Sequence, residues 1–123
     1  MTQPLALVFY ERLLPGTQLV NRLQDLNYRV ETVHDAAALV TSAKKSGALV
    51  VFADLESTQS NLCEVIALLK ENPATKHLPV VAFAHEQRGE LQAAARAVGA
   101  VAVSETALLS QLPQLIDQVL QLD

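Results

Sequence analysis

The amino-acid sequence predicts an α/β protein with a parallel sheet covered by helices on both faces. Short apolar or β-branched runs alternate with segments of helical periodicity from one end of the chain to the other. Several of the short runs are apolar at nearly every position, which is typical of strands buried on both sides. The 123 residues fit one domain spanning 1–123.

The first half of the chain predicts two strands and two helices. The run Leu5–Tyr10 is continuously apolar and predicts a buried strand. Residues 15–17 (Pro-Gly-Thr) predict a break, with the threonine capping a helix that ends at Asn27. The partly alternating segment Tyr28–Val33 predicts a strand nearer the sheet edge, and a helix follows over Ala36–Lys45.

The second half repeats the same pattern three times. The predicted elements are a central strand over 48–54, a helix over 60–71, a strand over 78–84, a helix that ends at Gly99, a strand over 101–103 and a last helix capped by Ser110. Five strand–helix units with short connections predict the flavodoxin-like (βα)5 fold. This is a doubly wound parallel sheet of strand order 2-1-3-4-5 in three layers, α/β/α.

Composition excludes several classes of protein. Half of the residues are hydrophobic and only 18% are charged, so a disordered chain is excluded. The net charge of −4 gives no reason to expect nucleic acid or an anionic membrane as a partner. The single cysteine, Cys63, excludes an internal disulfide, and no apolar run approaches the roughly 20 residues of a membrane span. We therefore expect a cytoplasmic protein.

Four segments, in order and at fitting intervals, resemble parts of one known domain. They are a loop into the second helix (His34–Leu39), a strand ending in an acid (Ala48–Leu55), a proline-led strand (His77–Val81) and a Gly-Ala turn (Val98–Ala100). Over nearly its full length the chain resembles the receiver domain of bacterial two-component response regulators. The resemblance implies signal transduction in a phosphorelay, with Asp54 at the position of the phosphate-accepting aspartate.

The rest of the receiver site departs from the family pattern. The family places an acidic pair after the first strand, where it binds Mg²⁺ with the phosphoacceptor. This chain has Tyr10 and Glu11 there, so at most Glu11 and Asp54 could form a weak metal site. No other acid occurs before Asp25.

Two further positions of the family pattern carry unsuitable side chains. The hydroxyl that binds a phosphoryl oxygen after the fourth strand falls at Ala84, which has no donor. The lysine that pairs with the phosphate after the fifth strand falls near Glu105 and Thr106, and no lysine follows Lys76. A glutamate in that place would repel a phosphoryl group.

These departures predict a pseudo-receiver that acts by protein–protein interaction, without enzymatic activity or a cofactor. The expected partner is a histidine kinase, a phosphotransfer or output protein, or a second copy of the chain. Three alternatives stay open. In the first, Asp54 serves only to bond nearby turn amides. In the second, it accepts a phosphoryl group in an atypical receiver that uses Mg²⁺. In the third, the chain is an unrelated flavodoxin-like enzyme or cofactor binder.

Receivers commonly contact partners through the fourth helix, the fifth strand and the helix that follows. The candidate residues on that face are Arg88, Leu91, Val103, Leu108 and Leu109. The two leucines fall in a predicted loop and have no evident core role, which favours a contact with a partner. Tyr10 has a different predicted place: its ring closes over Asp54 and fills the vacated metal site.

Overall fold

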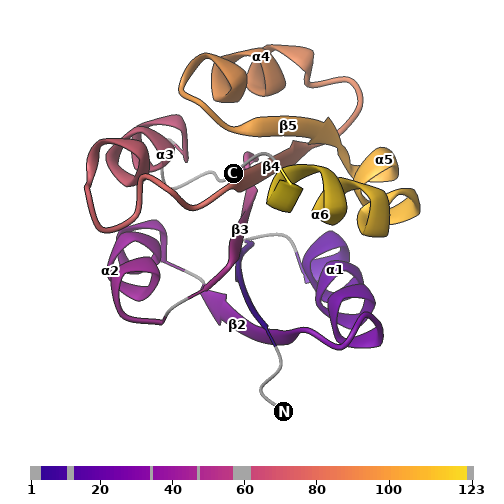
Figure 1. The fold of residues 1–123 in the computed structure, drawn as a ribbon. Coiled ribbons are helices and arrows are strands. Elements are labelled where there is room, and N and C mark those ends of the chain that lie inside the picture. The colour runs from indigo at the N-terminus through magenta and orange to yellow at the C-terminus, as the bar shows by residue number, and fades with distance from the viewer. Residues whose placement is uncertain (1–3, 11–12, 34, 47, 57–61, 122–123) are drawn as a thin grey trace.

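The computed structural model describes residues 4–10, 13–33, 35–46, 48–56 and 62–121. Strands and helices alternate along these residues (Figure 1). The elements are β1 (Leu5–Phe9), α1 (Leu13–Asp25), β2 (Arg29–Val33), α2 (Ala36–Ser46), β3 (Val50–Asp54), α3 (Leu62–Glu71), β4 (Val80–Ala84), α4 (Gly89–Ala97), β5 (Val101–Ser104), α5 (Glu105–Ser110) and α6 (Leu112–Gln121).

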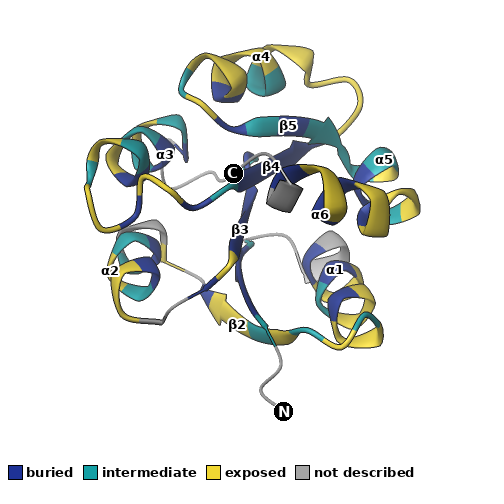
Figure 2. Cartoon of the chain, in the orientation of Figure 1, coloured by how far each residue is buried: buried dark blue, intermediate teal, exposed yellow. Residues whose placement is uncertain are grey.

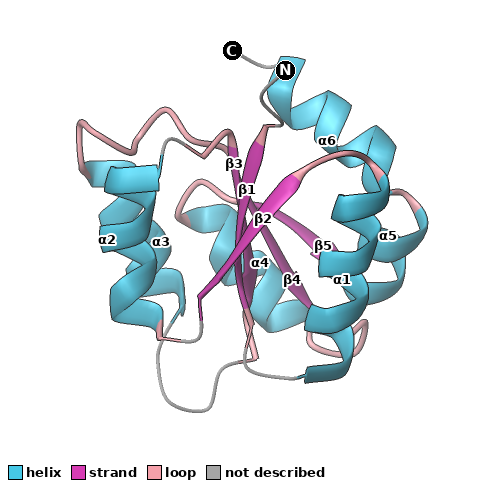
Figure 3. Cartoon of the chain, turned by 90° about the horizontal axis from the view of Figure 1, so that it is seen from below, coloured by secondary structure: helices cyan, strands magenta, loops and turns pink. Residues whose placement is uncertain are grey.

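The five strands form one parallel sheet in the order β2-β1-β3-β4-β5. Helices α2, α3 and α4 cover one face of the sheet, and α1, α5 and α6 cover the other (Figures 1 and 3). This confirms the predicted doubly wound fold. As predicted, β2 lies at an edge, and it is largely exposed, whereas β1, β3 and β4 are buried throughout.

Each face of the sheet has its own hydrophobic core, and the exposed residues lie on the outer sides of the helices (Figure 2). The first core cluster, beneath α2, α3 and α4, contains Leu7, Val51 and Ile66. The second core cluster, beneath α1, α5 and α6, contains Phe52 and Phe83. Residue alternation along the strands divides the side chains between the two clusters.

The predicted chain break before α1 is wrong. Helix α1 begins at Leu13 and runs through Pro15, Gly16 and Thr17. A proline is tolerated there because the N–H groups of the first helical turn have no intrahelical acceptor. A Cβ atom added to Gly16 would overlap the ring of Tyr10, so glycine lets the ring lie directly against the helix. Asn27 ends the helical segment with φ 68°, as predicted.

The loop predicted before the last helix is also wrong, because residues 105–110 form the short helix α5. Ser104 supplies the missing signal: its Oγ accepts a hydrogen bond from the N–H of Ala107 at 3.2 Å and caps the helix. Pro113 lies in the first turn of α6, where a proline is tolerated. None of the helices in the described part of the chain has the length and apolarity that crossing a bilayer requires.

Candidate functional site

The candidate site lies at the carboxyl ends of the strands, where open parallel sheets bind their ligands. Asp54 is the last residue of β3 and is fully buried, with 0% of its surface exposed. Its Oδ1 accepts a hydrogen bond from the N–H of Glu56 at 3.0 Å. This bond closes the turn that follows the strand, so part of the predicted turn-bonding role of Asp54 is present in the structure.

Glu56 joins this turn to the loop that follows β4. Its Oε2 accepts a hydrogen bond from the N–H of His85 at 2.8 Å, and its Oε1 lies 3.8 Å from Nη1 of Arg88. The glutamate side chain is only 15% exposed. Two loops 29 residues apart in sequence are therefore held together by one carboxylate at the ligand-binding edge of the sheet.

Arg88 completes the network on the solvent side. Its Nε donates a hydrogen bond to Oε1 of Glu90, in the first turn of α4. This bond is the main reason why the pKa of Arg88 is raised and that of Glu90 is lowered. Both groups are exposed to solvent, so the pair contributes little to the stability of the fold. Its effect is to fix the position of the guanidinium beside Glu56.

Glu56 was not among the residues that the sequence predicted for the site. Its position two residues after the candidate phosphoacceptor was the available signal. That position alone does not reveal the partners of Glu56, because His85 and Arg88 come close to it only when β3 and β4 pair. The register places Asp54 opposite Phe83, so the loops after the two strands start side by side.

The described residues of the predicted pocket lie at or just after the carboxyl ends of β1, β4 and β5. Ala84 ends β4, and its buried methyl group belongs to the first core cluster. Glu105 opens α5 directly after β5 and is half-buried, whereas Thr106 beside it is exposed. Tyr10 follows β1, and its ring packs against the second core cluster. Glu11 lies outside the described residues.

Tyr10 lies on the sheet face expected for a residue that covers Asp54. By strand alternation Asp54 continues the row of Phe52, which belongs to the second core cluster, and Tyr10 packs against the same cluster. That the ring closes over the carboxylate stays a prediction.

The metal site predicted from Glu11 and Asp54 also stays a prediction, because one of its two ligands is not described. Among the described residues, no three His, Cys, Asp or Glu side chains gather in a way that could hold a metal ion. Lys70 lies near the amino end of β4, away from the carboxyl ends of the strands. Its Nζ donates a hydrogen bond to the carbonyl of Leu78 at 2.8 Å, before β4 begins.

The predicted interaction face is only partly available. The expectation that Leu108 lacks a core role is wrong, because this leucine is 2% exposed and belongs to the second core cluster. Leu91, Val103 and Leu109 are half-buried, and Arg88 is exposed. Leu108 turns inward because residues 105–110 are helical, and a helix places adjacent residues about 100° apart.

Comparisons with known proteins identify the architecture. No family model and no curated protein matches the sequence. Many solved structures match. A putative response regulator from Chloroflexus aurantiacus superimposes with a TM-score of 0.89 at 14% identity, over 98% of this chain and 99% of that chain.

Two other structures agree with this result. A chemotaxis response regulator of Vibrio cholerae gives a TM-score of 0.76 at 22% identity, over 92% of this chain and 98% of that chain. The receiver domain of a sensor histidine kinase from Pseudomonas aeruginosa was solved with a magnesium ion in its active-site cleft. It gives a TM-score of 0.86 at 14% identity, over 98% of this chain and 99% of that chain. The chain therefore has the fold of response-regulator receiver domains.

Proposed function

We propose that this chain is a receiver-like signalling domain that acts by protein–protein interaction and is not switched by Mg²⁺-dependent phosphorylation. On this proposal it has no catalytic activity of its own and needs no cofactor. Its partners are proteins of a two-component pathway, in which the domain presents a fixed surface. The receiver fold supports the signalling role, and the contacts around Asp54 support the loss of phosphorylation.

The observation that carries the proposal is the position of the Glu56 carboxylate. It accepts the N–H of His85, a backbone donor at the carboxyl end of β4. The N–H of Glu56 itself is directed to Asp54. These two donors would otherwise be free to stabilise an anion arriving at the strand ends. In this chain both are engaged by the protein's own carboxylates.

Electrostatics point the same way. A phosphoryl group on Asp54 would bring about two negative charges into a site that already contains Glu56 at the same loop. Glu105, half-buried at the start of α5, adds a third acid at the family's lysine position. Like charges at short range disfavour one another, and more so where water is excluded.

The test is phosphorylation in vitro. The protein is incubated with Mg²⁺ and acetyl phosphate and its intact mass is measured, with a beryllofluoride titration followed by amide resonances in parallel. We expect no mass increase and no shift at the amides of Glu56 and His85. The Asp54→Asn variant is the control for modification elsewhere.

A mass increase that disappears in Asp54→Asn would overturn the proposal and establish the atypical phosphoreceiver. The variant Glu56→Ala makes the experiment sharper. If the carboxylate is what excludes an anion, this variant should show amide shifts with beryllofluoride at His85 that the parent protein lacks.

A further inference from the structure

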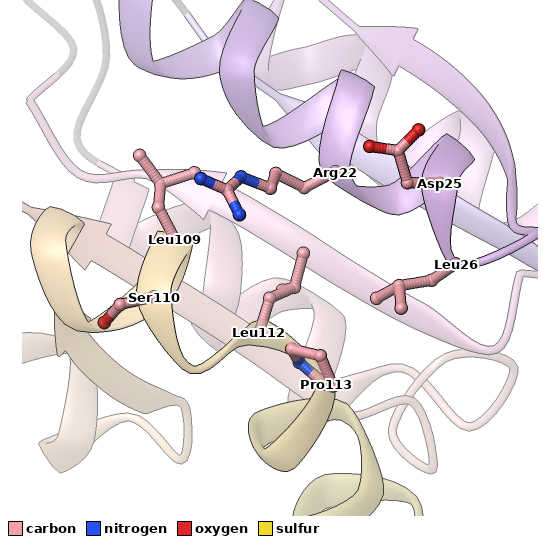
Figure 4. Close-up of a pocket in the computed structure, with 7 residues that line it drawn as sticks. All are labelled: Arg22, Asp25, Leu26, Leu109, Ser110, Leu112 and Pro113. Carbon is pink, nitrogen blue, oxygen red and sulfur yellow. The ribbon is translucent and has the colours of Figure 1, made fainter.

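A groove of about 210 Å³ lies between the last turns of α1 and the junction of α5 with α6 (Figure 4). Its lining residues are Arg22, Asp25, Leu26, Leu109, Ser110, Leu112 and Pro113. The floor is apolar, with Leu26 and Leu112 pointing into the space. The side chain of Arg22 extends along the groove toward Leu109, and Asp25 lies toward the opposite end.

Among the described residues that line the groove, only Arg22 and Asp25 are charged, and they have opposite signs. Both are exposed, and within the described ranges neither side chain forms a hydrogen bond or an ion pair. Asp25 is the last residue of α1, where the negative end of the helix dipole disfavours a carboxylate. A cation from outside the chain would relieve that repulsion.

We propose that this groove is the contact surface of a homodimer, in which Arg22 of each copy pairs with Asp25 of the other. The two charges are one helical turn apart on the same helix, about 4.5 Å along its axis. A two-fold axis that sets two α1 helices antiparallel brings each arginine opposite the partner's aspartate. A patch that carries both signs in this way is complementary to itself, which is what a two-fold interface requires.

The size of the groove favours a protein side chain over a small molecule. Small-molecule sites usually measure about 300–1,000 Å³, and this groove is smaller. Its volume suits the aliphatic stem of one arginine lying on Leu26 and Leu112, with the guanidinium at the far end beside Asp25.

The surroundings of the groove also suit a second copy. Most of the neighbouring exposed side chains of α1 and α6 are uncharged amides: Gln18, Asn21, Gln24, Gln114 and Gln118. Asp117 of α6 is also exposed and adds one negative charge. Depletion of charge is a feature of interface cores. Because the chain has a net charge of −4, two copies repel each other in general, and a face with few charges is where they can approach.

The dimer makes a specific prediction for charge reversal, measured by sedimentation velocity on the full chain over the micromolar to millimolar range. Arg22→Asp turns both reciprocal pairs repulsive, so its dimer dissociation constant should rise about tenfold or more. Asp25→Arg should do the same. The double variant R22D/D25R exchanges the two charges and should dimerise like the parent protein.

A mixture of the two single variants provides the decisive measurement. Its heterodimer contains two attractive pairs, so equimolar Arg22→Asp and Asp25→Arg should associate more tightly than either variant alone. Lys45→Asp, an exposed charge reversal on α2, should leave dimerisation unchanged. The interface is refuted if the parent is monomeric throughout, if Lys45→Asp weakens the dimer as Arg22→Asp does, or if the mixture fails to associate. These outcomes are independent of any result on phosphorylation.

Discussion

Replacing Gly16 by alanine should destabilise the protein, although alanine is the better helix former. In an exposed helix interior the exchange gains about 1 kcal/mol. Here the added Cβ would overlap three carbons of the Tyr10 ring, and forcing extra volume into a packed site costs about 1–3 kcal/mol. Because the overlap is with the ring itself, we place the cost at the upper end and expect a net loss of about 1–2 kcal/mol.

Urea unfolding followed by circular dichroism measures this loss as a change in the free energy of unfolding. Gly89→Ala is the matched control: it lies at the start of α4, and nothing lies within 4 Å of its added Cβ. It should be neutral or stabilise by up to about 1 kcal/mol. In a Tyr10→Ala background the penalty of Gly16→Ala should vanish, giving a coupling energy of about 1 kcal/mol or more.

The reasoning is refuted if Gly16→Ala is as stable as Gly89→Ala. It is also refuted if the penalty persists in the Tyr10→Ala background, because the ring would then not be its cause.

Two further predictions concern stability. Ser104→Ala removes the cap of α5 and should lower the free energy of unfolding, measured in urea, by about 1 kcal/mol. Ser110 is exposed at the end of the same helix, and Ser110→Ala should change stability by less than about 0.5 kcal/mol. Equal losses would contradict the capping role of Ser104. Burial raises the pKa of the Cys63 thiol above its ordinary 9.0. The folded state therefore favours the protonated thiol. The contribution of this thiol to folding stability is complete below its ordinary pKa and is lost as the pH rises through its raised pKa in the folded protein. Cys63→Ala should lose less stability on that alkaline side than the parent protein, and parallel curves would contradict the assignment.

Much of the fold could be predicted because burial leaves a local pattern. The continuously apolar run that ends at Asp54 marks a strand covered on both faces, and alternation of such runs with helical segments fixes a parallel sheet. Two predicted helix boundaries were wrong, and each error has a local cause that hydrophobic periodicity does not show. Pro15 suggested a break but sits in a first helical turn, and Ser104 begins a helix in which Leu108 turns into the core.

The candidate site could be predicted only in part. Its place at the strand ends follows from the parallel topology, and Asp54 is where the sequence puts it. The role of Glu56 could not be predicted, since its partners come from a different loop. The groove beside Arg22 was equally hidden, because its walls come from helices at opposite ends of the chain.

By itself the sequence determined which segments become strands and helices, because hydrophobic periodicity records how each element is buried. It also determined that Asp54 closes a central strand, that Ala84 ends the next one, and that Glu105 follows the last. Only the tertiary structure decided which polar groups meet. The Glu56 carboxylate binds the amide of His85 because strand pairing brings two distant loops to one edge of the sheet. Hydrogen bonds act over about 3 Å, so their partners are set by proximity in space rather than along the chain.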